Sequence, residues 1–436
     1  MKSLPEIVVV GGGAAGLELV TLLGERLGSG RRANIVLVDH ARAHLWKPLL
    51  HEIAAGSLDP GAYEVNYLAH AYRHGFRYCF GELDGIDRCA QRVLLAPTFD
   101  TEGRQISPTR SIPYDILVIA VGSVTNDFGT PGVAQHAIPL ETPAQAMRFN
   151  ERLLNGYLHA QTQAGPIRPG QLHVAIVGAG ATGTELAAEL HRTTRELVAY
   201  GLDRIDAGRD IRILLIEGAG RVLPALPERI SDATHRLLQQ MGVEIRTGTA
   251  VAEVTQEGLR LADGSFIAAE LVVWAAGVRA PAVLGQLGLE SNRVNQLVVE
   301  PTLQTTRDEH IFAIGDCAAC PEADGSRLVP PRAQAAHQEA AHMRRQVERV
   351  LSSRKLLPFR YRDFGSLVSL GRHTTVGSLM GLLVGRGVFV EGLFAGLMYR
   401  SLRALHERAL FGTAATVVRM LARGLTRSTR PVVKLH

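Results

Sequence analysis

Two segments of the chain carry the glycine spacing Gly-x-Gly-x-x-Gly. They comprise Gly11, Gly13 and Gly16 in the first segment and Gly178, Gly180 and Gly183 in the second. In such a loop the first glycine permits a tight turn, the second lets backbone approach a pyrophosphate, and the third allows close helix–strand packing. The N–H groups at the start of the following helix then face the phosphates. Both segments therefore predict dinucleotide-binding loops, with a purely structural turn as the alternative for each.

A carboxylate follows each loop at the end of an apolar run. Asp39 ends "NIVLVD" and Glu217 ends "IRILLIE". A carboxylate at this place accepts hydrogen bonds from a ribose, and in a nicotinamide domain it favours NADH over NADPH by repelling the 2′-phosphate. Arg221 is close enough in sequence to soften that repulsion, so the sequence favours NADH without excluding NADPH.

The elements that must hold these residues repeat along the chain. Each loop follows a short β-branched apolar run and opens a stretch with helical spacing. Each half closes with an apolar strand that runs into a glycine, at Gly122 in "YDILVIAVGS" and at Gly277 in "ELVVWAAGV". A third apolar run, in "IFAIGDCA", meets Gly315 and Asp316. The economical interpretation is an α/β protein with two Rossmann-type dinucleotide-binding domains.

Changes of pattern divide the chain into four parts. We expect the first domain over residues 1–140, the second over 141–290, a further part of the first over 291–350, and a C-terminal α+β region over 351–436. After Pro358 the residues alternate like strands, and from about Gly392 they have helical spacing. Two such domains suggest FAD and a nicotinamide, whose stacked rings would make hydride transfer a matter of positioning.

Composition excludes several classes of protein. A chain of 436 residues suits two or three domains. Four cysteines cannot form a disulfide scaffold, which favours a reducing, cytoplasmic setting, and the apolar run from Ile7 to Val10 is too short for a secretory signal. Cys317 and Cys320 have redox-motif spacing, but their place in "GDCAAC" disfavours a redox disulfide. No second Cys/His pair accompanies them, so we expect no metal.

The C-terminal end is basic and amphipathic. From Glu391 onward it holds eight Lys and Arg residues against two glutamates, whereas the net charge of the whole chain is +5. The apolar stretch over residues 376–399 is interrupted by charges and is too short for a span. Further on, two faces of a helix separate: Val417, Val418, Leu421 and Leu425 on one, and Arg419, Arg423 and Arg427 on the other.

This pattern predicts a helix that lies in a membrane interface with its arginines toward anionic headgroups. The alternatives are a helix that packs on its own protein or on a partner subunit, including a homodimer. Nucleic acid is disfavoured because the arginines come with apolar partners and without a recognition motif.

Several longer stretches resemble the type II NADH dehydrogenases, which are single-subunit, non-proton-pumping NADH:quinone oxidoreductases. The stretches include "HLWKPLLHEIAAGSLDP", "NDFGTPGV", "PPRAQAAHQEA" and "DFGSLVSLGR". The resemblance covers the chain to about residue 380. It implies an FAD domain that is discontinuous, an inserted NADH domain, and peripheral attachment to the cytoplasmic face of the cell membrane by the C-terminal region. Departing from the family, the C-terminal helix lacks tryptophans.

The resemblance also assigns roles to residues. Asp39 and the first loop would hold FAD, Asp316 the ribityl chain, and Lys47 with Pro48 would approach the flavin ring. Glu185 would face the nicotinamide. Ala333, Gln334 and Gln338, with His337 beside them, would lie in the segment that lines the quinone pocket. We expect Glu185, Gln334 and Gln338 to take part in catalysis, and the following residues to bind cofactor: Gly11, Gly13, Gly16, Asp39, Lys47, Gly122, Gly178, Gly180, Gly183, Glu217, Gly277, Gly315, Asp316, Ala333 and Gln334.

Each of these roles has a structural alternative. Asp316 is also a common helix cap, and Glu185 at a helix start also complements the helix dipole. Gln334 and Gln338 are four residues apart and share one helix face, which could be a solvated face, and His337 is favoured as structural over a proton donor. Two other functions stay open: a reductase with a soluble acceptor, such as a ferredoxin reductase or NADH oxidase, and a slow NADH-dependent redox sensor.

Overall fold

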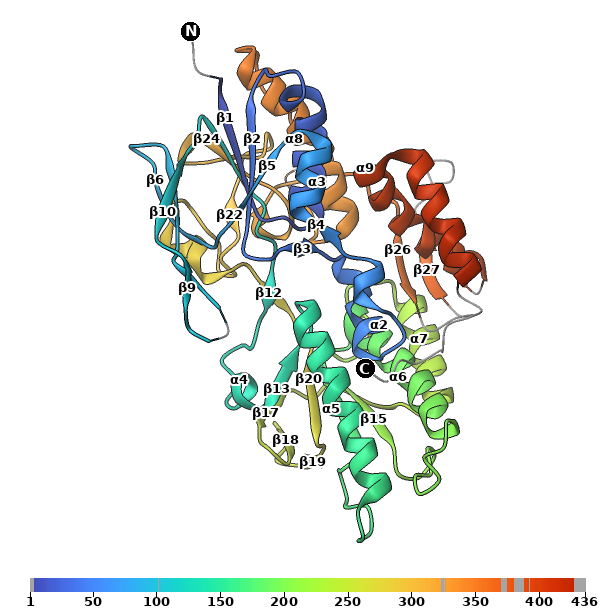
Figure 1. The fold of residues 1–436 in the computed structure, drawn as a ribbon. Helices are drawn as coiled ribbons and strands as arrows, with labels where there is room; N and C mark the ends of the chain where they lie inside the picture. The colour runs from blue at the N-terminus through green and yellow to red at the C-terminus, as the bar shows by residue number, and fades with distance from the viewer. Residues whose placement is uncertain are drawn as a thin grey trace.

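The structure is a computed structural model. It describes residues 4–100, 102–322, 325, 327–369, 375–379, 388–391 and 393–426. Two parallel sheets, one above the other in Figure 1, form the body of the molecule, and a C-terminal region lies at its side.

The first sheet has six strands in the order β23-β24-β11-β1-β2-β5, parallel except for the edge pair β23–β24. Its central strands are β-branched runs buried on both faces, as parallel strands between helices must be. The strands are β1 Glu6–Val10, β2 Asn34–Asp39, β5 Arg77–Phe80, β11 Ile116–Ile119, β23 Gln304–Thr305 and β24 Asp308–Ala313.

Helices from both ends of the chain cover this sheet. Helix α1 (Ala14–Leu23), which continues as a π-helical turn at Gly24–Gly28, packs against α8 (Ala333–Leu351). Helix α3 (Tyr67–His74) lies beside strand β5. Strand β24 and helix α8 return to the first sheet after the whole second sheet has been built, so the first unit is discontinuous in sequence, as predicted.

The second sheet is fully parallel, in the order β13-β20-β14-β15-β16. Its strands are β13 Ala137–Pro139, β14 His173–Val177, β15 Arg212–Glu217, β16 Glu244–Thr247 and β20 Leu271–Trp274, and its helices are α5 Pro143–Thr162, α6 Ala181–Ala199 and α7 Glu228–Gln240. Helix α5 begins at a capping box in which Thr142 and Gln145 satisfy each other's backbone N–H groups.

Short elements complete the two units. Strands β12 (Val124–Thr125) and β21 (Val278–Arg279) pair as an antiparallel ribbon where the chain passes between the sheets. The remaining short elements are β3 Ala43–His44, β4 Val65–Asn66, α2 Leu50–Ala54, β6 Leu83–Asp87, β7 Arg92–Leu95, β8 Thr98–Phe99, β9 Gln105–Ser107, β10 Arg110–Pro113, α4 Val133–His136, β17 Val251–Val254, β18 Gly258–Leu261, β19 Phe266–Ala268, β22 Leu297–Val298 and β25 Ala318–Ala319, with 3-10 turns at Lys47–Leu49, Pro60–Ala62, Ala282–Gln286 and Gly315–Cys317.

The C-terminal region contains three antiparallel strands and a bent helix. The strands are β26 Ser366–Ser369, β27 Thr375–Leu379 and β28 Val388–Glu391, and helix α9 runs over Leu393–Thr426. Strands after Pro358 followed by a helix near Gly392 were expected and are confirmed. Gly412 has φ +77° inside α9, a left-handed conformation that favours glycine, and it bends the helix there. Among the described helices, none combines the length and apolar content needed to cross a bilayer.

Candidate functional site

In the first glycine loop, two glycines are required by the protein's own packing. A Cβ on Gly11, whose φ is +103°, would lie 2.4 Å from the carbonyl oxygen of Ala120, and one on Gly16 would lie 1.8 Å from the Gly11 carbonyl oxygen. A Cβ on Gly13 would meet nothing within 4 Å. The first and third glycines thus shape the turn, while the second borders open space.

The second loop repeats this arrangement. A Cβ on Gly178 (φ +102°) would lie 2.6 Å from the Ala276 nitrogen, and one on Gly183 would lie 1.9 Å from the Gly178 carbonyl oxygen. Gly180 again borders open space. The equivalence of Gly13 and Gly180 therefore holds in three dimensions as well as in sequence.

Both loops meet the chemical requirements of a pyrophosphate site. Helices α1 and α6 have Gly13 and Gly180 as N-caps and no side-chain cap, so their first N–H groups are not taken up by a capping side chain. Such N–H groups, together with the helix dipole, favour an anion. The residues present fit the phosphates of a dinucleotide at each loop.

The two predicted carboxylates lie at the loops. An Asp39 oxygen accepts a hydrogen bond from the Gly12 N–H at 2.6 Å, and a Glu217 oxygen accepts one from the Ala179 N–H at 2.8 Å. Each carboxylate ends the strand next to its loop strand, in β2 and β15 respectively. This is the place from which a carboxylate reaches the ribose of a bound dinucleotide.

Lys47 and Asp316 come together through a residue that sequence reasoning missed. The Ser123 hydroxyl donates to Asp316 Oδ2 at 2.7 Å, and Lys47 Nζ donates to the Ser123 carbonyl at 2.9 Å. The sequence signal that could have revealed Ser123 is its position directly after Gly122. A Cβ on Gly122 would meet nothing within 4 Å. Asp316 lies in the 3-10 turn after β24 and adjoins this cluster from the other end of the chain.

Glu339 in α8 is a second residue that the sequence did not single out. It is 2% exposed, and Glu339 Oε2 accepts a hydrogen bond from the Gly315 N–H at 2.5 Å. Burial raises the pKa of Glu339 to about 8, although the Gly315 N–H favours the charged form. Glu339 therefore fixes the turn that carries Asp316. A Cβ on Gly277 would lie 2.6 Å from the ring of Phe128, and the expected role of Gly277 in binding cofactor stays a prediction.

Glu185 lies in a buried polar cluster between the two units. It is 6% exposed in α6, and its Oε2 is 3.5 Å from Nδ1 of His51 in α2. Burial lowers the pKa of His51 to about 4, so the imidazole is neutral. One turn along α6, Glu189 pairs with Arg192. Sequence analysis missed His51, which follows Lys47 and Pro48 by one helical turn.

The side chains of Gln334 and Gln338 bond to one segment, as their shared helix face predicts. The Gln334 amide nitrogen donates to the Asp363 carboxylate at 3.1 Å and to the Gly365 carbonyl at 3.0 Å. The Gln338 amide bonds both ways with the backbone of Arg362, at 2.9 and 3.0 Å. Both amides thus hold the start of the C-terminal region against α8, and the neighbouring Ala333 is the first residue of that helix.

Cys317 and Cys320 are free, buried thiols. Burial raises the pKa of each to about 12, so neither is a thiolate at neutral pH. Within the described parts of the chain, no group of three or more His, Cys, Asp or Glu side chains is arranged to hold a metal ion.

The prediction that the C-terminal arginines point toward anionic headgroups is wrong for Arg419 and Arg423. The Arg423 guanidinium bonds Glu407 at 2.6 Å and lies 4.8 Å from the centre of the Tyr63 ring, while that of Arg419 lies 4.3 Å from the centre of the Phe411 ring. Both therefore point into the protein, where a carboxylate and aromatic faces compensate their burial. Arg427 lies outside the described residues.

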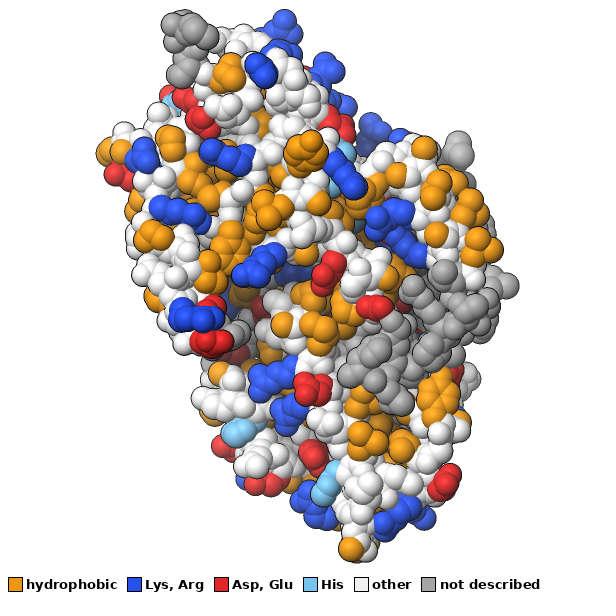
Figure 2. Space-filling model, in the orientation of Figure 1, with side chains coloured by type: hydrophobic (Ala, Val, Ile, Leu, Met, Phe, Trp, Pro, Cys, Tyr) orange, Lys and Arg blue, Asp and Glu red, His pale blue; other side chains and the backbone are white. Residues whose placement is uncertain are grey.

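The opposite face of α9 after Gly412 is apolar and exposed. Its large side chains are between 47% and 78% exposed, namely Val417, Val418, Met420, Leu421 and Leu425. Figure 2 shows hydrophobic side chains gathered over α9, at the upper right of the view. A patch of adjacent apolar side chains on one helix marks a surface that meets a partner or a membrane.

Comparisons with known proteins agree with this geometry. Residues 5–340 match the family described as pyridine nucleotide-disulphide oxidoreductase. The chain is 44% identical to a type II NADH:quinone oxidoreductase of Haemophilus influenzae over 446 aligned positions, which cover 99% of this chain and 100% of that protein. A type II NADH:quinone oxidoreductase of Staphylococcus aureus is 29% identical, over 86% of this chain and 90% of its own length.

Solved structures share the fold. The structure of NDH2 from Plasmodium falciparum in complex with NADH matches with a TM-score of 0.84 at 18% identity, covering 99% of this chain and 100% of that one. The sulfide:quinone oxidoreductase of Aquifex aeolicus matches less closely, with a TM-score of 0.70 at 16% identity over 98% of this chain and 96% of that one.

Proposed function

This chain belongs to the type II NADH:quinone oxidoreductases, within the pyridine nucleotide-disulphide oxidoreductase family, and on that premise we propose how its residues divide the work. The enzyme oxidises NADH with FAD as its cofactor and passes two electrons to a quinone. The observation that carries the proposal is the pair of matching glycine loops. In each loop the second glycine, Gly13 or Gly180, borders open space at the start of a helix that has no side-chain cap.

The first glycine loop binds FAD. Backbone N–H groups after Gly13 hold its pyrophosphate, and Asp39 accepts hydrogen bonds from its ribose. Asp316 bonds the ribityl chain, and its orientation depends on the Ser123 hydroxyl and on the turn that Glu339 holds. Lys47 lies with Ser123 beside this site and adds a positive charge near the ring. When bound, FAD supplies the two-electron redox chemistry.

The second glycine loop binds NADH. Gly180 lets the α6 backbone approach its pyrophosphate, and Glu217 selects a free 2′-hydroxyl over a 2′-phosphate. Glu185, buried beside His51, faces the nicotinamide side of the interface between the two units. Gln334 and Gln338 keep the start of the C-terminal region on α8, and so shape the wall of the quinone site.

The exposed face of α9 rests on the cytoplasmic face of a membrane. Its apolar side chains would enter the outer part of the bilayer, from which a quinone diffuses to the enzyme. Because Arg419 and Arg423 are occupied inside the protein, this part of α9 would attach through its apolar side chains rather than through these two arginines. A second copy of the chain on this face is the alternative occupant.

An anaerobic titration tests the proposed function. NADH added to the purified protein should bleach the yellow flavin absorbance, and a short-chain quinone added afterwards should restore it. A protein purified without flavin that also fails to take up added FAD would refute the proposal. Restoration by ferredoxin but not by quinone would favour a soluble-acceptor reductase instead.

A further inference from the structure

Phe128 combines two features that a folded protein normally avoids. Its side chain is 64% exposed, and its φ is +52°, in the left-handed region. A bulky side chain in that region is an outlier, and a large apolar ring left in water gains no free energy from burial. A residue in such a conformation persists only where its surroundings impose it, and residues of this kind gather at functional sites.

The surroundings of Phe128 fix its turn to the second sheet. The Phe128 N–H donates to Asn126 Oδ1 at 3.0 Å. Trp274, the last residue of β20, donates from Nε1 to the Asn126 carbonyl at 2.9 Å, and the Asn126 N–H donates to the Gly277 carbonyl at 3.3 Å. The end of β20 therefore holds the turn, and the turn holds the ring at one place.

The ring of Phe128 lies beside the second glycine loop. It covers Gly277, on which a Cβ would lie 2.6 Å from Cζ of the ring. The residue before it, Ala276, contacts the loop itself, because a Cβ on Gly178 would lie 2.6 Å from the Ala276 nitrogen. An exposed aromatic ring thus borders the loop to which we assign NADH.

The strand order indicates which half of NADH would pass this ring. Strand β14, which runs into the loop, lies between β15 and β20. Strand β15 ends in Glu217, the carboxylate for the ribose of the adenine half. With its pyrophosphate at the loop and its adenine half toward β15, the nucleotide would extend its nicotinamide half over the end of β20. Strand β12, shortly before Phe128, lies between the two sheets in Figure 1, on the way to the proposed flavin site.

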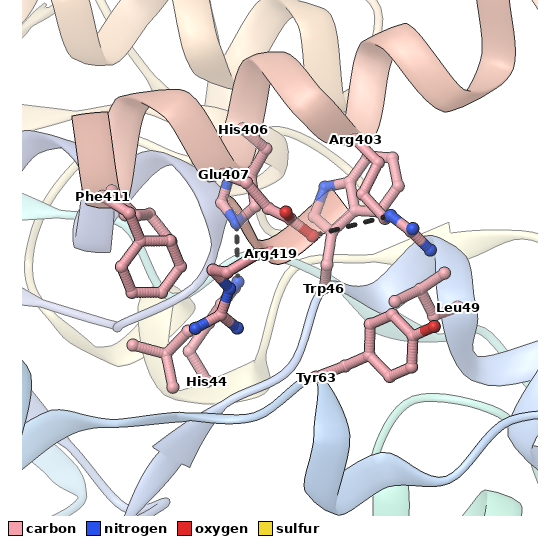
Figure 3. A pocket seen from close by; sticks show the side chains of 11 residues that line it. His44, Trp46, Leu49, Tyr63, Arg403, His406, Glu407, Phe411 and Arg419 are labelled. Atoms are coloured by element: carbon pink, nitrogen blue, oxygen red, sulfur yellow. Dashed lines mark hydrogen bonds and ion pairs between the residues drawn. The ribbon is translucent and has the colours of Figure 1, made fainter. Parts of the chain in front are cut away.

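Trp46 is the alternative aromatic residue for such a contact, because it directly precedes Lys47. Figure 3 shows Trp46 in a cavity together with His406 and Arg403 of α9. It is 6% exposed and stacks on His406, with the ring centres 5.9 Å apart. In the described part of the chain, every residue that lines this cavity belongs to the first unit or to α9. The protein itself therefore covers Trp46, whereas the ring of Phe128 is open to a ligand.

We propose that the ring of Phe128 binds the nicotinamide half of NADH and holds it against the end of β20 beside Gly277. The inference rests on the proposed function and deepens its NADH site. An aromatic ring attracts a flat partner by stacking, and it attracts the positively charged ring of NAD⁺ as well. The exposure and the left-handed backbone of Phe128 then serve a contact that forms only when the nucleotide is bound.

Two ligands that differ only in the nicotinamide ring test this contact. ADP-ribose keeps the adenine half and the pyrophosphate of NAD⁺ but lacks nicotinamide. In the FAD-loaded protein, Phe128→Ala should raise Kd for NAD⁺ about three- to tenfold, measured by calorimetry, and leave Kd for ADP-ribose within about twofold of wild type. Phe128→Tyr, which keeps the ring, should bind both ligands like wild type. Phe99→Ala is the matched control, because Phe99 is 57% exposed but lies on β8 of the first unit.

Thermal denaturation without nucleotide separates binding from folding. Because the ring of Phe128 is mostly exposed, Phe128→Ala should keep Tm within about 2 °C of wild type. Equal weakening of NAD⁺ and ADP-ribose binding, unchanged binding of both, or a much lower Tm in Phe128→Ala would overturn the inference and leave Phe128 a structural role. A wild-type protein that binds neither NAD⁺ nor ADP-ribose would instead refute the NADH site of the proposed function.

Discussion

Gly13 and Gly180 do not owe their identity to protein packing. A methyl group on either would meet no protein atom within 4 Å, whereas one on Gly11, Gly16, Gly178 or Gly183 would collide with backbone. We therefore expect a need for glycine at Gly13 and Gly180 to come from a ligand that approaches the backbone. Substitutions at these two positions can therefore distinguish an effect on ligand binding from an effect on folding.

Alanine at these two positions should remove one cofactor at a time. We expect Gly13→Ala to weaken FAD binding at least about tenfold, and Gly180→Ala to raise KM for NADH by a similar factor with FAD retained, because the added methyl occupies the space of a phosphate. Flavin absorbance per chain and steady-state kinetics measure the two effects. Gly156→Ala, in helix α5 with equally open surroundings, is the control and should leave both unchanged. Loss of folding in Gly13→Ala would contradict the argument.

The buried Glu339 makes the stability of the protein depend on pH. Its pKa is about 8 in the folded protein, above the ordinary value of 4.5, so folding favours the protonated form. The contribution of protonated Glu339 to the free energy of unfolding is present in full below the pKa that Glu339 has in the unfolded chain. It is lost as pH rises through the pKa that Glu339 has in the folded protein. Glu339→Gln should therefore raise Tm relative to wild type near pH 8 and change it little near pH 5, measured by thermal denaturation.

The exposed Glu309 gives the matched comparison. Its side chain is 84% exposed, so the difference in Tm between Glu309→Gln and wild type should be the same near pH 5 and near pH 8. If Glu339→Gln and wild type keep a constant difference in Tm from pH 5 to pH 8, Glu339 is ionised throughout, and its role at the turn needs another explanation.

Individual site residues were predictable where the backbone imposes a residue type. The glycines, Asp39, Glu217 and Asp316 follow directly from loops and strand ends, which are local in sequence. Ser123 and His51 were missed, because their partners lie far away in sequence, and only the fold brings them together. Their roles toward FAD, NADH and quinone stay predictions.

At the level of elements, α9 has two faces with different tasks. The face with Arg419 and Arg423 is attached to Phe411, Glu407 and Tyr63. The other face has only apolar side chains among its large exposed residues after Gly412. The sequence predicted the helix and its two faces, but it gave the arginines the wrong direction. Periodicity separates faces without stating which one meets the protein. The arginines turn inward because the bend at Gly412 brings them to Glu407 and Phe411 of the first part of α9, and Arg423 also to Tyr63.

A single charge on the apolar face tests its proposed contact with lipid. We expect Leu421→Glu to lower binding to phospholipid vesicles about tenfold, in a flotation assay, without loss of flavin or ferricyanide activity. Leu158→Glu is the control, because Leu158 is similarly exposed, at 54%, but lies on α5. Unchanged flotation together with a change in sedimentation from dimer to monomer would assign this face to a second copy of the chain.

Across the whole molecule, the sequence predicted the architecture correctly. The internal repeat of strand, loop and helix revealed both sheets, and the third apolar run at Asp308–Ala313 revealed the return to the first sheet. It did not predict how the C-terminal region docks, because that depends on single polar contacts such as Gln334 with Gly365 and His406 with Glu18. The domain limits at residues 140, 290 and 350 remain predictions.

The late return of strand β24 sets an order of events during synthesis. A ribosome completes the second sheet, up to Trp274, before it makes the strand and the turn that carry Asp316. Nascent chains that stop near residue 300 should thus be able to retain a nicotinamide nucleotide while remaining colourless. The flavin would enter only when β24 has paired with β11, so yellow colour would report that synthesis has passed β24.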